Sequence, residues 1–382
     1  MTEWKEYKLG EVIKTNVESI GKDYPYSKIL YLDTGSITRN NIDQYQEFEL
    51  DKAPSRAKRL VKQDDIIYSS VRPNQLHYGY ITNPANNLVV STGFVTITCN
   101  KAYIEPKFLY YYLTQENITE YLHSVAEAST SAYPSLKARD IESLYIELPP
   151  LPEQIRIASI LSSLDDKIDL LHRENKTLEA MAETLFRQWF IEEAKEDWEE
   201  GKLGDEFEFT MGQSPNGDSF NEDGIGFPMY QGNADFGFRF PTRRVFTTQP
   251  TRFAEINDTL ISVRAPVGAQ NMATEKCCIG RGVAAFRYKH NHDFYSYTYY
   301  KLKSLLEEIK QYNDNGTVFG SISKSDFENI DIVIPDINTI QHFQEQVKPI
   351  DDKIINNNKQ IQTLIQQRDS LLPKLMSGEV KI

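Results

Sequence analysis

Two long stretches of the chain carry apolar residues at seven-residue intervals. The first stretch, from Glu153 to about Glu193, contains neither proline nor glycine. Heptad spacing sustained over several repeats is typical of a coiled-coil seam, so each stretch is predicted to form a long helix. The predicted seam residues are Ile157, Leu164, Leu171, Leu178 and Leu185 in the first helix, and Phe343, Ile350, Asn357, Leu364 and Leu371 in the second.

Neither predicted helix can bury its apolar stripe alone. Because both stripes occur in one chain, an intramolecular antiparallel pair is favoured, with a homodimer as the alternative. Antiparallel pairing would place the flanking globular domains at opposite ends of a rod of about 60 Å. Asn357 is the polar member of its series. It is interpreted either as a buried polar residue that fixes the register of the seam or as part of a locally exposed turn.

Short strand-like runs precede each long helix. Ile29–Leu32, Asp65–Ser70 and Phe94–Thr98 are rich in the aromatic and β-branched residues that favour strands. Residues 105–123 and 293–312 carry apolar residues at helical spacing instead. Each region is therefore expected to be a globular domain of the α/β (α+β) class.

The two halves of the chain repeat each other. Collinear matches at nearly one offset indicate a tandem duplication: Trp4–Glu11 returns as Trp198–Asp205, Asp65–Arg72 as Asp258–Arg264, and Asp165–Ile168 as Asp351–Ile354. The duplication predicts four consecutive parts, namely a first globular domain over residues 1–152, a first long helix over 153–194, a second globular domain over 195–338, and a second long helix with a tail over 339–382.

Composition narrows the class of protein. A chain of 382 residues fits more than one domain. Its 42 basic and 55 acidic residues give a net charge of −13, which excludes a histone-like binder but not a local basic patch. Three cysteines are too few for a disulfide framework. Because the sequence also lacks a long apolar run and an apolar N-terminal signal, a cytoplasmic protein without membrane contact is expected.

No concentrated catalytic motif occurs in the sequence. The phosphate-binding patterns G-x-x-x-x-G-K-[ST] and G-x-G-x-x-G are missing, and so is the nucleophile motif G-x-S-x-G. An amino-methyltransferase needs an Asn/Asp-Pro-Pro-aromatic loop, but Pro149-Pro150 is flanked by leucines. His290 and His292 form a close pair without the further ligands of a zinc site. The sequence therefore predicts a non-catalytic chain without a metal site.

Basic residues gather just upstream of the duplicated strand in both halves. Such clusters can neutralise phosphates, although a solvated basic face is the alternative. Arg72 and Arg264 follow the predicted strand and either read a guanine edge or brace their own domain. The turn-rich segments 129–135 and 313–324 are interpreted as DNA-facing loops or as ordinary connections. The candidate DNA-binding residues are Arg56, Lys58, Arg59, Arg72, Ser131, Tyr133, Lys137, Arg239, Arg243, Arg244, Arg264, Arg281, Asn315, Ser321 and Lys324.

Three segments carry a resemblance to a known family. They are the junction Ile146–Ile155, which reads IELPPLPEQI, the segment Glu183–Phe190 at the end of the first helix, and the C-terminal Leu371–Glu379. Together with the duplication, they resemble the DNA-specificity subunit of type I restriction-modification systems over the whole chain. The second junction, Val333–Gln341, departs from the Leu-Pro-Glu-Gln form, which leaves the start of the second helix open.

The resemblance implies two target-recognition domains, separated by two long helices that pack as an antiparallel coiled coil. Each domain would bind one half of a bipartite, asymmetric double-stranded DNA target. The helices would set the distance between the halves and dock two modification (methyltransferase) subunits, and restriction subunits would complete the assembly. S-adenosylmethionine, ATP and Mg would belong to these partner subunits, with no cofactor in this chain. A coiled-coil adaptor that does not bind DNA is the competing hypothesis.

Overall fold

The computed structural model describes residues 4–128, 135–311 and 320–382. The chain divides into two compact units, which are described separately below. Unit 1 comprises residues 1–170 and 360–382, and unit 2 comprises residues 171–359. The candidate residues Ser131, Tyr133 and Asn315 lie outside the described residues.

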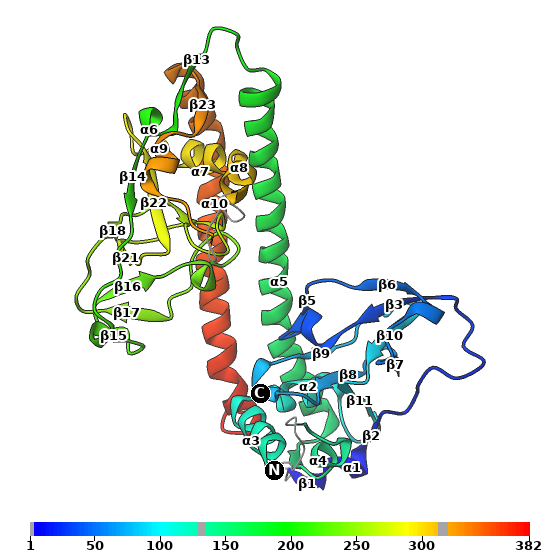
Figure 1. Cartoon of the computed structure of the whole chain (residues 1–382). Coiled ribbons are helices and arrows are strands. Elements are labelled where there is room, and N and C mark those ends of the chain that lie inside the picture. Colours follow the sequence, from blue (N-terminus) through cyan, green and yellow to red (C-terminus); the bar gives the residue numbers. More distant parts are fainter. Residues whose placement is uncertain (1–3, 129–134, 312–319) are drawn as a thin grey trace. The chain divides into compact units, whose positions relative to one another are not determined.

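Unit 1 contains an α/β domain built on two four-stranded mixed or antiparallel sheets (Figure 1). The strand orders are β2-β11-β8-β9 and β6-β3-β10-β7, and a β1–β12 pair closes the domain. The strands are β1 (Lys5–Lys8), β2 (Ile13–Thr15), β3 (Lys28–Leu32), β4 (Ile37–Thr38), β5 (Asn41–Ile42), β6 (Gln46–Glu49), β7 (Ala57–Leu60), β8 (Ile66–Ser69), β9 (Tyr78–Tyr80), β10 (Leu88–Ser91), β11 (Phe94–Cys99) and β12 (Tyr145–Leu148). The helices are α1 (Leu9–Val12), α2 (Pro106–Leu113), α3 (Glu116–Glu127) and α4 (Ala138–Glu142), with short 3-10 turns at Thr34–Ser36, Leu50–Lys52 and Pro73–Gln75.

Unit 2 repeats this architecture, except that its second sheet has five strands in the order β15-β17-β16-β21-β18. The strand order β14-β22-β19-β20 corresponds to β2-β11-β8-β9, and the pair β13–β23 corresponds to β1–β12. The strands are β13 (Glu199–Lys202), β14 (Phe207–Met211), β15 (Phe220–Asn221), β16 (Phe227–Tyr230), β17 (Val245–Thr247), β18 (Phe253–Ala254), β19 (Thr259–Ser262), β20 (Gln270–Met272), β21 (Cys277–Ile279), β22 (Val283–Tyr288) and β23 (Asp331–Ile334). The helices are α6 (Leu203–Glu206), α7 (Tyr295–Ser304), α8 (Leu306–Gln311) and α9 (Lys324–Glu328), with 3-10 turns at Gly217–Ser219 and Asn233–Asp235.

The predicted strands are confirmed in position as β3, β8 and β11, and the shared strand order of the two units agrees with the duplication. The run Asp65–Ser70 forms β8, a central strand whose four residues Ile66–Ser69 are all buried, as expected for a strand covered on both faces. The expected helix over residues 105–123 is instead two helices, α2 and α3, which are separated at Thr114 and Gln115.

Two long helices supply segments to both units. The first, α5 (Leu151–Arg187), continues into a π-helical turn at Gln188–Glu192, and the second is α10 (Ile337–Met376). Asp336 precedes α10 and accepts a hydrogen bond from the Thr339 amide at 3.0 Å, so an aspartate caps this helix where the Leu-Pro-Glu-Gln form is missing. This places the start of the second helix at Ile337.

The two helices run antiparallel within each unit. In unit 1, Leu161 of α5 shares a buried cluster with Leu375 of α10, and the later Asp165 of α5 accepts a hydrogen bond from the earlier Arg368 of α10 at 2.9 Å. In unit 2, Phe186 of α5 lies 5.6 Å, between ring centroids, from Phe343 of α10, and the earlier Asn175 of α5 accepts from the later Asn357 of α10 at 2.9 Å. These pairs confirm the predicted intramolecular antiparallel coiled coil.

The seam uses both apolar positions of each heptad, as a coiled coil requires. Among the predicted residues, Ile157, Leu171, Phe343 and Asn357 are buried, whereas Leu164, Leu178, Leu185, Ile350, Leu364 and Leu371 are partly buried. The interleaved positions are more uniformly buried, namely Leu161, Ile168, Asn175, Ala182, Val347, Ile354 and Ile361. Asn357 is fully buried, and its Nδ2 donates to Asn175 Oδ1 at 2.9 Å and to Glu174 Oε2 at 3.0 Å. The buried interpretation of Asn357 is therefore correct.

Candidate nucleic-acid interface

One end of the central sheet in unit 1 gathers several basic candidates. The Ser70 amide, just after β8, donates to the Gly93 carbonyl at 2.7 Å, and the Leu136 amide donates to the Ser70 carbonyl at 2.7 Å. Val71 pairs with Ser135 in an isolated bridge, and the exposed Arg72 follows it. The Thr92 amide donates to the Arg56 carbonyl at 2.8 Å. Backbone hydrogen bonds therefore link the segments that carry Arg56 and Arg72 to each other and to Ser135, which ends the loop expected to face DNA.

Unit 2 carries the same arrangement at the end of β19. The Val263 amide donates to the Gly282 carbonyl at 2.9 Å, and the Ile322 amide donates to the Val263 carbonyl at 3.2 Å. Arg264 pairs with Ser321 in an isolated bridge, equivalent to the Val71–Ser135 bridge. The Ile279 amide donates to the Arg252 carbonyl at 2.9 Å, as Thr92 does to Arg56. The duplicated strand therefore ends beside exposed arginines in both units.

The backbone at the first strand end adopts an uncommon conformation. Arg72 has a φ of 46° and a ψ of 69°, and Leu76 has a φ of 59°. Both residues therefore lie in the left-handed region of backbone conformation. This conformation costs a residue that has a Cβ of order 1 kcal/mol, and it occurs more often at binding sites than elsewhere. Ser69 Oγ accepts a hydrogen bond from the Val71 amide at 3.2 Å and supports this turn. The turn holds Arg72 at the exposed edge of the domain.

The basic candidates differ in whether a carboxylate already neutralises them. Four of them form ion pairs: Arg243 with Glu275, Arg244 with Asp235, Lys324 with Glu328 at 3.4 Å, and Arg239 with Asp351 at 2.8 Å. Within residues 4–128, 135–311 and 320–382, no ion pair is formed by Arg56, Lys58, Arg59, Arg72, Lys137, Arg264 or Arg281. Burial lowers the pKa of the half-buried Arg59. The basic residues without an ion pair are better suited to bind phosphate, because no internal ion pair has to break before they do so.

Arg239 is wrongly placed among the DNA-contacting candidates. Its side chain is only 1% exposed, and its guanidinium donates to Asp351 Oδ1 at 2.8 Å. Burial is the largest single influence and opposes the charge, but Asp351, Tyr299, Tyr300 and Glu179 together outweigh it and raise the pKa of Arg239 above its usual value. A guanidinium that is enclosed and already neutralised cannot reach a phosphate. In sequence, this arginine is indistinguishable from the exposed Arg243 and Arg244.

Two residues of the loop after β14, Gln213 and Ser214, are not among the candidate residues that the sequence suggested. The Gln213 amide donates to the Ile279 carbonyl at 3.0 Å, and Ser214 Oγ accepts from the Arg281 amide at 3.2 Å. This loop approaches the turn of Arg281 so closely that a Cβ at Gly212 would lie 2.2 Å from the Gly280 carbonyl oxygen. The available signal was glycine at both contacting positions, which permits close backbone approach. Gln213 and Ser214 therefore extend the candidate interface of unit 2.

Clustered metal ligands are not found in the described part of the chain. Over these residues, no group of three or more His, Cys, Asp or Glu side chains is arranged to hold a metal ion. None of the helices in the same ranges is both long enough and apolar enough to span a bilayer.

Comparison with known proteins supports this assignment of the two units. Residues 1–180 and 195–367 each match the family described as type I restriction modification DNA specificity domain. The chain is similar to a putative type I restriction enzyme MjaX specificity subunit of Methanocaldococcus jannaschii, with 31% identity over 98% of this chain and 90% of that protein. It is also similar to the type I restriction enzyme HindI specificity subunit of Haemophilus influenzae, with 25% identity over 100% of both chains.

A solved structure supports the fold. The S subunit of a type I restriction-modification system from M. genitalium matches with a TM-score of 0.60 and 19% identity, over 98% of this chain and 96% of that chain. The family match extends over nearly the whole sequence in two consecutive segments, which correspond to the two repeated α/β domains and their helices. The chain belongs to the family of type I restriction modification DNA specificity domains, and it carries two of them.

Proposed function

We propose that this chain is the sequence-specificity subunit of a type I restriction-modification complex and that it binds a bipartite, asymmetric DNA target. Membership in the family gives it a role in DNA target specificity. The observation that carries the finer proposal is the repeated strand end, where Arg72 in unit 1 and Arg264 in unit 2 are exposed and next to the candidate loops. Two similar but divergent readers would recognise two different half-sites.

Arginines without an ion pair are suited to both functions of a DNA-binding surface, namely phosphate neutralisation and base recognition. A guanidinium without an internal carboxylate partner can neutralise phosphate and release counterions, which supplies salt-dependent affinity. The same group can donate two hydrogen bonds to the O6 and N7 atoms of guanine in the major groove. Arg56 immediately precedes the edge strand β7 and Lys58 is its second residue, and both are assigned to phosphate. Arg72 and Arg264, which follow central strands, are assigned to base edges.

The catalytic chemistry is proposed to reside in partner subunits. Two modification subunits would dock on the long helices and bring S-adenosylmethionine, and restriction subunits would bring ATP and Mg. Exposed apolar side chains on α5 support a docking role, since Ile155, Leu170 and Met181 are 52%, 48% and 52% exposed. The chain itself would then direct adenine methylation and restriction without binding a cofactor.

Mapping modified adenines in cells tests the proposal. The chain is produced together with its modification subunits, and methylated sites are sequenced across the genome. Arg72→Ala is expected to weaken selection at one half-site, and Arg264→Ala at the other, each by about tenfold or more per lost bidentate contact. Lys28→Ala is the matched control, because Lys28 is exposed but pairs with Glu49 across neighbouring strands.

Two outcomes would contradict the proposal. If methylation shows no two-part motif that depends on this chain, the protein acts as an adaptor without a reading function. If both arginine variants relax the same half-site, the two domains do not read separate halves of the target.

A further inference from the structure

Arg239 lies buried where the second recognition domain contacts both long helices in unit 2. Its Nη2 donates to Asp351 Oδ1 of α10 at 2.8 Å, and its Nη1 lies 3.5 Å from Glu179 Oε1 of α5. Its Nη1 also donates to Tyr300 Oη at 3.2 Å, and its Cζ lies 3.3 Å from the ring centroid of Tyr299. One guanidinium therefore joins a loop of the domain to α5, to α10 and to α7.

The backbone of Arg239 is fixed to the central sheet of the same domain. Its carbonyl accepts a hydrogen bond from the Met272 amide of β20 at 2.9 Å. Asn271 Nδ2, also on β20, donates to the Gly237 carbonyl at 2.9 Å and holds the preceding part of the loop. Movement of the sheet relative to the helices would therefore have to displace the guanidinium from its two carboxylates.

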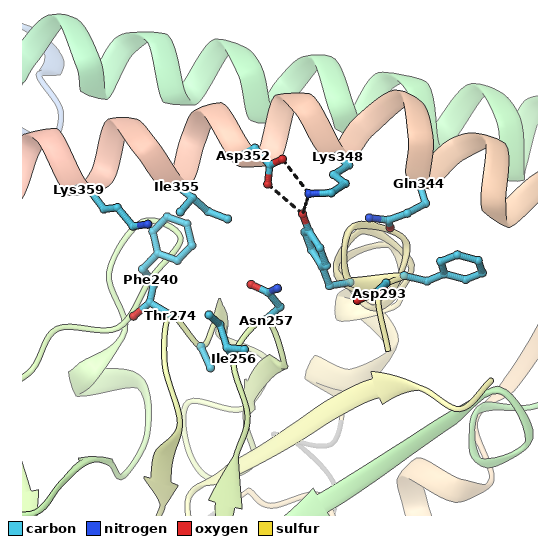
Figure 2. A pocket seen from close by; sticks show the side chains of 13 residues that line it. Phe240, Ile256, Asn257, Thr274, Asp293, Gln344, Lys348, Asp352, Ile355 and Lys359 are labelled. Atoms are coloured by element: carbon cyan, nitrogen blue, oxygen red, sulfur yellow. Dashed lines mark hydrogen bonds and ion pairs between the residues drawn. The ribbon is translucent and has the colours of Figure 1, made fainter. Parts of the chain in front are cut away.

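The contact surface beside Arg239 is not fully packed. A cavity of about 490 Å³ separates the loops of the second recognition domain from α10 in unit 2 (Figure 2). Phe240, Ile256 and Thr274 lie on the domain side, and Lys348 and Ile355 lie on the α10 side. Beside this cavity the domain packs on the helices through the buried apolar cluster that contains Tyr297, Phe343 and Val347. Apolar packing of this kind has little directional preference, whereas the ion pair of Arg239 with Asp351 at the same contact fixes a direction.

In unit 1, the aspartate of the long helix is paired with an arginine from a different element. Asp165 is the counterpart of Asp351 in the repeat, and its carboxylate accepts from Tyr111 Oη at 2.7 Å and from Arg368 Nη1 of α10 at 2.9 Å. The hairpin tip that corresponds to Arg239 carries Arg39, whose amide donates to the Leu76 carbonyl beside β9. Arg39 is exposed. In unit 1 the helix supplies the arginine, whereas in unit 2 the recognition domain supplies it.

We propose that Arg239 is a positioning residue for DNA recognition: it fixes the orientation of the second recognition domain on the helices and so fixes the number of base pairs allowed between the half-sites. This inference rests on the proposed bipartite recognition. Buried ion pairs contribute little net stability compared with apolar side chains of similar volume, but they can restrict a protein to one arrangement. The predicted consequence of losing Arg239 is a protein that folds but tolerates more than one gap.

The test replaces Arg239 together with its hydrogen-bond partners Tyr300 and Asp351, so that neither member of the ion pair is left buried alone. The variant Arg239→Met/Tyr300→Phe/Asp351→Leu leaves Glu179 paired with Lys303, which lies 2.7 Å from it. It is produced with its modification subunits, and methylated adenines are mapped genome-wide. We expect unchanged half-sites, an unchanged or higher melting temperature, and about tenfold more methylation at gaps one base pair longer or shorter. Tenfold corresponds to about 1.4 kcal/mol.

A second variant separates positioning from general loosening of the helices. Asn175→Leu/Asn357→Leu also removes a buried polar pair from unit 2, but both of its residues lie on the helices, so the gap should not change. The inference is overturned if the Arg239 variant is folded and methylates with the wild-type gap, or if both variants broaden the gap equally. Absence of a two-part motif with the wild-type chain would instead refute the proposed function.

Discussion

The buried carboxyl group of Glu206 makes the stability of unit 2 depend on pH near neutrality. Glu206, the last residue of α6, is 2% exposed, and its Oε1 accepts a hydrogen bond from Tyr297 Oη at 2.6 Å. Its Oε2 has no hydrogen-bond partner among the described residues. Burial, only partly offset by the nearby Lys301, raises the pKa of Glu206 from 4.5 to about 7. The folded state therefore holds a proton that the unfolded state releases between these two values.

The sign of the pH dependence follows from this shift. Because the native state binds more protons than the unfolded state, the free energy of unfolding falls as pH rises. The contribution is fully present below about pH 4.5 and is lost as pH passes through about 7. A shift of about 2.5 units at about 1.36 kcal/mol per unit gives a loss of about 3 kcal/mol.

Glu206→Gln isolates this effect, because glutamine keeps an acceptor for Tyr297 and never ionises. We expect the variant to unfold with a free energy about 3 kcal/mol above that of wild type at pH 8 and equal to it near pH 4.5. Urea unfolding followed by tryptophan fluorescence measures this. The chain has three tryptophans, and a Trp4→Phe background leaves Trp189 and Trp198, which both pack in the core that contains Tyr297.

An exposed carboxylate provides the control. Glu222→Gln should leave the free energy of unfolding unchanged at both pH values, since Glu222 is exposed on a loop. The reasoning would be refuted if Glu206→Gln destabilised unit 2 equally at pH 5 and pH 8, because the hydrogen bond rather than the proton would then dominate.

Three further predictions follow from the described contacts. In the complex, the double substitution Arg56→Ala/Lys58→Ala should reduce the slope of log affinity against log salt concentration by about two. Arg243→Ala/Arg244→Ala should reduce it less, because both arginines already pair with carboxylates. Titrating DNA affinity against salt measures both slopes, and equal reductions would contradict the assignment. Asn175→Leu/Asn357→Leu should raise the melting temperature, since apolar groups replace a buried polar pair, and a fall seen by calorimetry would show that the pair is stabilising. Inserting one heptad after Leu171 and one after Asn357 should lengthen the gap by up to about three base pairs without changing the half-sites, and an unchanged gap in an active protein would exclude the helices as the spacer.

The long helices and the duplication could be predicted because their signals are local and periodic. The heptads that begin at Ile157 and Phe343 are visible without knowledge of any contact. The depth of burial at each position was less accessible, since Asn175 is buried through a bond to Asn357, which lies 182 residues away. The sequence around a polar seam residue is the same whether that residue bonds to another side chain or to water, so it does not reveal burial.

The candidate interface could be predicted only in outline. Repetition of the strand that ends in Arg72 and Arg264 pointed to a region that has the same backbone pairing in both domains, and its role in binding DNA stays a prediction. The error at Arg239 has a physical origin, because a loop arginine is exposed in most settings and becomes a buried contact only when carboxylates from distant helices surround it. Glu179 and Asp351 carry no sequence signal of that role. Long-range charge pairing of this kind is settled by the tertiary fold.

The arginine that pairs with the helix aspartate comes from a different element in each unit, and it is buried only in unit 2, which limits how such genes can exchange segments. The position in α5 that corresponds to Arg368 is Ala182, which is small and fully buried in unit 2. A recombinant that received a foreign second domain without an arginine equivalent to Arg239 would leave Asp351 buried without its cation, at a cost of about 3–5 kcal/mol. A domain from the first half, transplanted into the second, would face the same deficit. In functional recombinants of the second half, the arginine equivalent to Arg239 and the helix carboxylates should therefore be inherited together. In the first half, a new domain can be accepted without this constraint, because Asp165 and Arg368 both lie on the long helices.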